Sequence, residues 1–129
     1  MKQIYKALTI AGSDSSGGAG IQADLKTFSA LGVYGASAIT AVTAQNTCVV
    51  TAVQGMSADL VAAQIEAILD DISIDAIKIG MLADPDIVGI VATGLKKFTG
   101  PIVLDPVMVA KSGDALLTED AVQHLIDHL

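Results

Sequence analysis

A glycine-rich segment near the start of the chain constrains the fold more than any other feature. The segment, residues 11–20, reads AGSDSSGGAG, follows the apolar run Ala7–Ile10 and leads into a helical pattern that begins at Ile21. A strand, a flexible turn and a helix N-terminus in this order form a concave corner that suits an anion or a polar ligand. The segment therefore predicts a βα unit with a binding site at its turn.

Asp24 interrupts the apolar face of the helix that is expected to follow this turn. At about 3.6 residues per turn it falls inside the arc of apolar side chains formed by Ile21, Leu25, Phe28 and Leu31. A carboxylate in such an arc is costly unless a hydrogen-bond donor contacts it. The pattern leaves open whether that donor is a protein group or a ligand.

Strand and helix signals alternate along the whole chain. The predicted strands are Lys6–Ile10, Ala36–Thr43, Val49–Val53, Asp75–Ile79 and Pro101–Leu104. The predicted helices are Ile21–Leu31, Ala58–Ile72, Pro85–Phe98 and Glu119–Leu129. Alternation of this kind predicts a mainly parallel sheet between layers of helices, except that the second and third strands are too close for a helical crossover and must form a hairpin or a change of strand.

Composition and capping residues agree with this interpretation. Hydrophobic residues make up 52% of the chain but aromatic residues only 3%, which is typical of parallel strands buried on both faces by aliphatic side chains. Ser57, Asp84 and Thr118 stand where N-caps of the later helices are expected, and Pro85 would occupy a first helical position.

Charge and patterning exclude several classes of protein. The formal net charge is −7 and the chain has no arginine, so a nucleic-acid partner is not expected. No apolar run approaches the eighteen or so residues that span a bilayer, and the N-terminus lacks a signal-peptide pattern, so we expect a cytoplasmic protein. The single cysteine, Cys48, cannot form an intrachain disulfide and is interpreted as structural.

Ligands of open parallel sheets bind beyond the carboxyl ends of the strands. An amide, Gln45, a soft apolar side chain, Met81, and a carboxylate, Asp105, follow three of the predicted strands, and Gly12 begins the turn after the first. Together with Asp24 they suit a flat ligand with polar edges, such as an aminopyrimidine. Each also has a structural alternative, since an amide can cap a loop, a methionine can fill a core and an aspartate can begin a turn.

Two familiar nucleotide motifs fail on inspection. Residues 18–23 match the glycine spacing of a dinucleotide-binding turn, but no acidic residue occurs between Leu25 and Ala58 to hold a ribose. Residues 12–17 have the glycine spacing of a P-loop, but Gly18 and Ala19 replace the required lysine and hydroxyl residue. His124 and His128 are spaced like a metal clip, yet a solvated pair is the preferred interpretation.

Four blocks of the chain resemble, in order, those of the hydroxymethylpyrimidine/phosphomethylpyrimidine kinases of thiamine biosynthesis. The blocks are AGSDSSGGAGIQADLKT (residues 11–27), TAQNT (43–47), IKIGML (77–82) and LDPVM (104–108). The resemblance implies a three-layer α/β/α fold of the ribokinase-like superfamily, truncated on its C-terminal side, with residues 1–129 forming the N-terminal, substrate-binding half of one kinase domain. It also implies transfer of a phosphoryl group from ATP, with Mg²⁺, to 4-amino-5-hydroxymethyl-2-methylpyrimidine and then to its monophosphate.

The resemblance assigns roles to individual residues. Positions matching Asp24 and Gln45 hydrogen-bond the pyrimidine, and those matching Gly12, Met81 and Val107 line its pocket. Asp105 matches an acid that lies towards the metal and the phosphates. The family's catalytic base and most of its ATP site belong to a C-terminal half, so no catalytic residue is expected among these 129.

Two alternatives to the kinase stay open. One is a non-catalytic remnant that keeps the pyrimidine contacts, and the other is activity like that of the related pyridoxal kinases. Because the last predicted helix has no C-cap and no following strand, we expect an uncovered sheet edge that makes the chain aggregate or form a homodimer.

Overall fold

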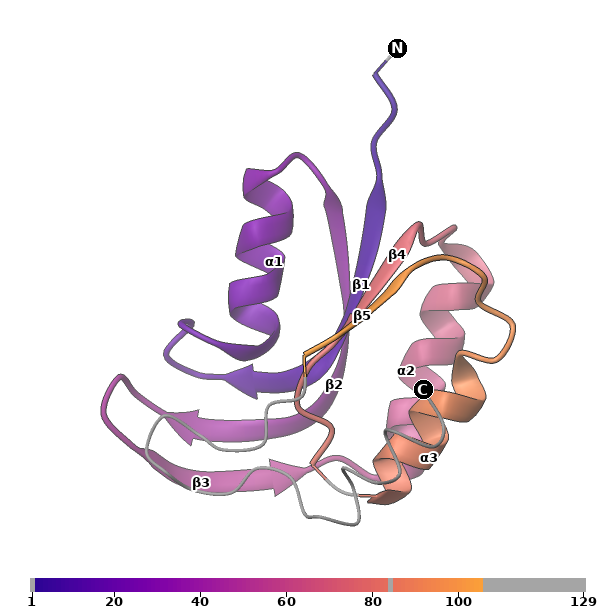
Figure 1. Cartoon of the computed structure of the whole chain (residues 1–129). Coiled ribbons are helices and arrows are strands. Elements are labelled where there is room, and N and C mark those ends of the chain that lie inside the picture. Colours follow the sequence, from indigo (N-terminus) through magenta and orange to yellow (C-terminus); the bar gives the residue numbers. More distant parts are fainter. Residues whose placement is uncertain (1, 84, 106–129) are drawn as a thin grey trace.

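The computed structural model describes residues 2–83 and 85–105 of the chain, and Figure 1 shows how its elements are arranged. In chain order the elements are β1 (Lys6–Asp14), α1 (Gly20–Ala30), β2 (Tyr34–Gln45), β3 (Val50–Gly55), α2 (Ala58–Asp71), β4 (Ala76–Ile79), α3 (Pro85–Gly94) and β5 (Ile102–Leu104). Helix α1 covers one face of the sheet, and α2 and α3 cover the other (Figure 1). The expected three-layer α/β/α arrangement is confirmed.

The five strands form one sheet in the order β3-β2-β1-β4-β5. Strand β1 pairs in parallel with β2 and with β4, and β4 pairs in parallel with β5. Strands β2 and β3 pair antiparallel, so the close pair of predicted strands is a hairpin. In this mainly parallel sheet the carboxyl ends of β1, β2, β4 and β5 lie together. We call this end of the strands the carboxyl edge of the sheet, and the site lies there.

An aliphatic core fills the space between the sheet and helices α2 and α3. Leu8 and Ile10 of β1 and Ile77 and Ile79 of β4 are fully buried there. Their partners from the helices and the loops beside them are Val61, Ile65, Leu82, Ile87, Val88, Val91 and Leu95. Helix α2 begins as predicted, because the Ser57 hydroxyl accepts a hydrogen bond from the backbone N–H of Leu60 at 3.2 Å.

The face under α1 is less apolar. Ile21 is the one buried residue of α1, whereas Leu25 and Phe28 are half-buried and pack against Gly35 of β2. Leu31 is 74% exposed and lies at the C-cap, so its expected place in the apolar arc is wrong. The helix ends there and the chain turns towards the next strand, so the side chain at the C-cap no longer faces the sheet.

Strands β1 and β2 extend further than their sequence patterns predict. β1 continues through Asp14, so the first residues of the expected glycine-rich turn belong to the strand. Their pairing shifts register between Ala11 and Ser13, because two residues of β2, Thr40 and Ala41, stand opposite the single residue Gly12. This bulge is typical of strand ends near binding sites.

Other boundaries differ by less, and some expectations fall outside the described residues. Helix α3 ends at Gly94 rather than at Phe98, because the chain continues there in turns. The expected helix Glu119–Leu129 and the expected caps Asp84 and Thr118 lie outside residues 2–83 and 85–105. Within those ranges, no helix has both the length and the apolar character needed to cross a membrane.

Candidate functional site

The turn between β1 and α1 is organised by one buried carboxylate. Asp14 is 3% exposed, and its Oδ1 accepts hydrogen bonds from the backbone N–H and the hydroxyl of Ser16, at 2.8 and 2.7 Å. Its Oδ2 accepts from the backbone N–H groups of Gly18, at 3.1 Å, and Ala19, at 2.8 Å. Four hydrogen bonds on one side chain therefore replace the regular structure that this segment lacks.

These hydrogen bonds also fix the charge of Asp14. Burial alone would raise the pKa of this carboxyl, but the hydrogen bonds from Ser16, Ala19 and Gly18 outweigh burial and hold the pKa below the usual 3.8. The carboxylate is therefore ionised at neutral pH and serves as an acceptor only.

Two glycines allow close approaches at this turn. Gly20 has a φ of +58°, and a Cβ there would lie 2.3 Å from the carbonyl oxygen of Gly12. At Gly12 a Cβ would lie 2.5 Å from the Cε atom of Met81. Glycine at position 20 is required by the backbone, whereas glycine at position 12 makes room for a side chain of the site.

Asp24 has two protein partners, and both contact the same oxygen. Its Oδ2 accepts a hydrogen bond from the Thr9 hydroxyl at 2.6 Å and forms an ion pair with the Lys78 ammonium group at 2.9 Å. The Asp24 and Lys78 side chains are 16% and 23% exposed. A protein donor therefore stabilises the carboxylate in the apolar arc, and a ligand is not needed to explain it. Both contacts use Oδ2, and among the described residues Oδ1 has no hydrogen bond.

The end of β2 is held against the β1–α1 turn by hydroxyl groups. The Ser15 hydroxyl donates to the carbonyl oxygen of Gln45 at 2.5 Å and accepts from the backbone N–H of Gln45 at 2.8 Å. The Thr43 hydroxyl lies 2.8 Å from the carbonyl oxygen of Ser13 and 3.2 Å from Oε1 of Gln45. The backbone and the amide of Gln45 are therefore both positioned by neighbours.

The loop between β2 and β3 is shaped by an asparagine. The Asn46 side-chain oxygen accepts hydrogen bonds from the backbone N–H groups of Cys48 and Val49, at 2.8 and 2.9 Å. Asparagine can form such a turn with its own side chain, so the loop closes although Cys48, Val49 and Val50 follow in place of a glycine. Cys48 is exposed in this loop as a free thiol and lines the cavity, so its interpretation as a structural apolar residue is wrong.

Met81 is fixed through its backbone. The hydroxyl of the fully buried Thr40, in the bulge of β2, donates to the carbonyl oxygen of Met81 at 2.6 Å. The side chain of Met81 is half-buried and lies against Gly12. Met81 therefore lies at the surface of a cavity rather than in the core.

A cavity of about 620 Å³ lies at the carboxyl edge of the sheet. Five of the six residues predicted for the site line it, namely Gly12, Asp24, Gln45, Met81 and Asp105. The sixth, Val107, lies outside the described residues. The parallel topology thus brings together residues separated by up to 93 positions in the sequence.

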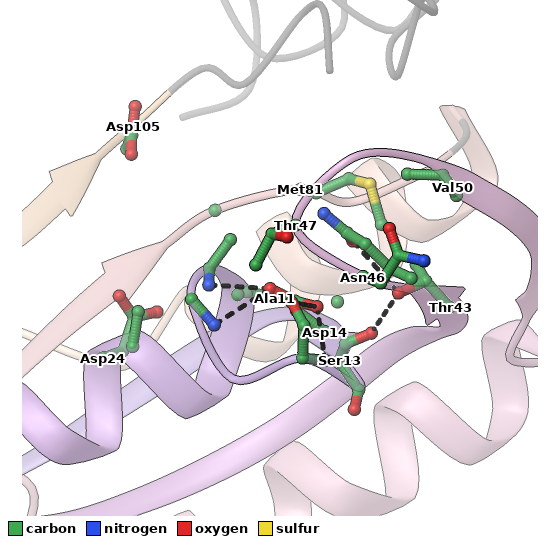
Figure 2. Close-up of a pocket in the computed structure, with 18 of the residues that line it drawn as sticks. Ala11, Ser13, Asp14, Asp24, Thr43, Asn46, Thr47, Val50, Met81 and Asp105 are labelled. Carbon is green, nitrogen blue, oxygen red and sulfur yellow. Dashed lines mark hydrogen bonds between the residues drawn. The ribbon is translucent and has the colours of Figure 1, made fainter. Parts of the chain in front are cut away.

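The cavity has two chemically different ends. In Figure 2, Asp24 and Asp105 lie on one side of the view, and Thr43, Asn46, Val50 and Met81 lie on the other. Lys78 also lines the cavity and is paired with Asp24, so the first end carries both signs of charge. The second end combines amide groups with apolar side chains, which suits an uncharged heterocycle.

Asp105 follows β5, and its backbone N–H donates to the carbonyl oxygen of Ile79 at 2.8 Å. Its side chain is exposed at the mouth of the cavity. Across residues 2–83 and 85–105, no group of three or more His, Cys, Asp or Glu side chains could hold a metal ion by itself. A lone carboxylate still fits Mg²⁺, which is commonly held by one or two carboxylates together with substrate phosphates.

Sequence reasoning assigned no role to several side chains that organise the site, among them Asp14, Ser15, Thr43 and Lys78. Asp14 could have been found from its place before a Ser-Ser-Gly-Gly run, where aspartate commonly begins a turn. Lys78 is a lone charge in an otherwise apolar strand, which is the same signal that identified Asp24. Ser15 and Thr43 give no comparable signal, because both contacts depend on tertiary structure.

Comparisons with known proteins agree on one family. The family model described as phosphomethylpyrimidine kinase matches residues 14–129. The hydroxymethylpyrimidine/phosphomethylpyrimidine kinase of Rhizobium meliloti (strain 1021) is 62% identical over 123 residues, which cover 95% of this chain and 46% of that protein. The chain thus spans about half the length of the curated relatives it matches.

Solved structures give the same result. The crystal structure of phosphomethylpyrimidine kinase from Clostridium difficile 630 superposes with a TM-score of 0.89 at 54% identity, covering 96% of this chain and 54% of that one. Pyridoxal kinase from Staphylococcus aureus, in complex with AMP-PCP and pyridoxal, superposes with a TM-score of 0.79 at 35% identity, covering 98% of this chain and 45% of that one. The likeness thus extends to two kinds of vitamin kinase.

Proposed function

We propose that this chain, which belongs to the phosphomethylpyrimidine kinase family, supplies the pyrimidine-binding half of a kinase that phosphorylates 4-amino-5-hydroxymethyl-2-methylpyrimidine and its monophosphate in thiamine biosynthesis. In this proposal residues 1–129 form the N-terminal, substrate-binding half of one ribokinase-like domain. The observation that carries the proposal is the convergence of Gly12, Asp24, Gln45 and Met81 on one cavity at the carboxyl edge of the sheet.

The proposed contacts follow from the chemistry of each residue. Gln45 offers an amide to the polar edge of the pyrimidine, and Met81 offers a polarisable surface to the ring face. Gly12 leaves room for Met81, and Val107 would complete the lining. Asp24 lines the cavity and would offer Oδ1 to the ligand, while Lys78 and Thr9 hold Oδ2.

ATP is the proposed phosphoryl donor, because this is a kinase family and a structural relative is in complex with the ATP analogue AMP-PCP. Asp105 would hold Mg²⁺ together with phosphate oxygens, and the bound ion would neutralise charge on the transferred group. The catalytic base is proposed to come from outside these 129 residues, since the chain spans about half the length of its relatives.

Calorimetric titration of the 129-residue chain with 4-amino-5-hydroxymethyl-2-methylpyrimidine tests the proposal. We expect binding, and we expect Gln45→Ala to weaken it by roughly 1–3 kcal/mol because ligand groups lose their hydrogen-bond partner. Gln54→Ala is the matched control, since Gln54 is an exposed glutamine on β3 that does not line the cavity. Absence of binding, or equal affinity of Gln45→Ala and the unaltered chain, would refute the proposed site.

Two further measurements separate the alternatives. Adding ATP and Mg²⁺ and following phosphate transfer distinguishes a working kinase from a chain that binds pyrimidine without turnover. Titration with pyridoxal tests the second alternative, which is favoured by the superposition on pyridoxal kinase. Tighter binding of pyridoxal than of the pyrimidine would reassign the substrate.

We also propose a cytoplasmic homodimer. The free, exposed thiol of Cys48 suits a reducing compartment. The exposed apolar side chains of β5, with Val103 61% and Ile102 40% exposed, suit association through that edge of the sheet. Sedimentation equilibrium tests the dimer, and a monomer at all concentrations would contradict it.

A further inference from the structure

The Thr43 hydroxyl touches two oxygen atoms but has only one proton to give. Its Oγ1 lies 2.8 Å from the carbonyl oxygen of Ser13 and 3.2 Å from Oε1 of Gln45. A threonine hydroxyl donates one hydrogen bond and accepts others through its lone pairs. The two contacts can both be full hydrogen bonds only if one of them is made by a donor on the other side.

The carbonyl of Ser13 cannot be that donor, because a backbone carbonyl only accepts. The amide of Gln45 can be, since a half-turn about its last bond exchanges oxygen and nitrogen with almost no change of shape. The Thr43 proton then goes to Ser13 over the shorter contact, and Nε2 of Gln45 donates to the lone pair of Thr43. The requirement for one donor in each hydrogen bond thus favours the amide orientation in which Nε2 faces Thr43 and Oε1 faces away from it.

The amide end away from Thr43 is the one left for a ligand. Gln45 lines the cavity, and within residues 2–83 and 85–105 its side chain contacts no hydrogen-bond partner other than Thr43. The backbone of Gln45 is held on both its N–H and its carbonyl by Ser15, so the side chain starts from a fixed position two residues after Thr43.

We propose that Thr43 is a positioning residue that fixes the polarity of the Gln45 amide, so that this end of the cavity presents an acceptor and selects a ligand bearing an amino group over one bearing a carbonyl. A carbonyl oxygen would face Oε1 with like partial charge, whereas an exocyclic amine would donate to it. The inference deepens the proposed function and rests on it for the identity of the ligand.

The first test needs no ligand. In the ¹⁵N-labelled chain, exchange of the Gln45 Nε2 protons with water is measured by NMR, the signals being identified by their loss in Gln45→Ala. We expect one proton to be protected in the unaltered chain and in Thr43→Ser, and several-fold faster exchange in Thr43→Val. If Oε1 faced Thr43 instead, both protons would already be open to the cavity, and equal exchange in all three proteins would overturn the inference.

The second test compares a matched pair of ligands by calorimetry. The ligands are 4-amino-5-hydroxymethyl-2-methylpyrimidine and the same molecule with a 4-oxo group. The unaltered chain and Thr43→Ser are expected to prefer the amino compound by about tenfold or more, since the oxo compound leaves a polar group of the site without a hydrogen-bond partner. In Thr43→Val the amide is free to turn, and the preference should fall to within about threefold for the same reason.

A loss of stability alone would weaken both ligands equally and would leave their ratio unchanged. An unchanged ratio in Thr43→Val, or a preference of the unaltered chain for the oxo compound, would therefore overturn the selection. If the unaltered chain binds neither ligand, the proposed function and the selectivity fail together, while proton exchange still decides the orientation of the amide.

Discussion

The two faces of strand β1 differ although they belong to the same nine residues. Leu8 and Thr9 are adjacent and both are fully buried. Leu8 packs into the aliphatic core beneath α2 and α3, whereas Thr9 donates a hydrogen bond to Asp24 beneath α1. One face of the sheet thus carries the aliphatic core, and the other carries an ion pair and a hydroxyl group.

This difference separates two tasks. The aliphatic face can supply stability without reaching the cavity, because apolar burial needs no particular orientation of polar atoms. The α1 face buries fewer apolar side chains, and it positions the Asp24–Lys78 ion pair at the cavity instead. Substitutions on the two faces should therefore differ in size and in their dependence on pH.

The largest effect is expected on the aliphatic face. Leu8→Ala should lower the free energy of unfolding by about 2–5 kcal/mol, because it removes buried methyl groups and leaves a cavity. Leu60→Ala is the control, since Leu60 on α2 is 49% exposed and its loss should cost under about 1 kcal/mol. Urea unfolding followed by circular dichroism measures both, and a similar cost for the two would contradict the division between the faces.

A smaller effect is expected from the ion pair on the α1 face. Lys78→Met should lower stability by about 1–3 kcal/mol, because it leaves the carboxylate of Asp24 half-buried and without its cation. Adding Asp24→Asn should recover part of that loss, since the unpaired charge is then removed. Lys26→Met is the control, because Lys26 is exposed and, within the described part of the chain, its side chain hydrogen-bonds the carbonyl oxygen of Gly17 alone. Strictly additive losses in the double variant would argue that the pair is not coupled.

The smallest of the three effects depends on pH. Asp14→Asn should cost about 1–2 kcal/mol near neutral pH, because an amide cannot accept all four hydrogen bonds of the turn. Since the native pKa of Asp14 lies below 3.8, its contribution is present above that value and is lost as the pH falls through the native pKa. The gap between Asp14→Asn and the unaltered chain should therefore close in acid.

Urea unfolding at about pH 7 and about pH 3 measures this gap. Asp70→Asn, on the exposed side of α2, is the control that should show little difference at either pH. A gap that stays constant down to low pH would show that Asp14 acts by shape rather than by charge.

Much of the fold could be predicted because the spacing of apolar residues and the residues that cap helices act locally. The helix Ala58–Ile72 was predicted to within one residue of α2, since Ser57 marks its start and its apolar stripe is regular. The rule that ligands bind at the carboxyl ends of strands brought Gly12, Gln45, Met81 and Asp105 together correctly around one cavity. What each of them binds stays a prediction.

The rest could not be predicted because it depends on which strands become neighbours. The unusual position of Asp24 was visible in the sequence, but its partner Lys78 lies 54 residues away and meets it only when β1 and β4 pair. The same holds for Thr43 and Ser13, which are 30 residues apart. Leu31 was misplaced because a helical wheel does not show where a helix ends.

The extra residue in β2 sets which side chains face the cavity. Thr40 and Ala41 are buried in succession, and the alternation then resumes with Val42 exposed and Thr43 buried. In a regular strand of period two, Thr43 and Gln45 would lie on the opposite side. Shortening the strand by one residue at this point would leave its first half paired as before and rotate the amide out of reach of any guest. Recognition of a small molecule at this site therefore depends on the number of residues in β2 as well as on the chemistry of its side chains.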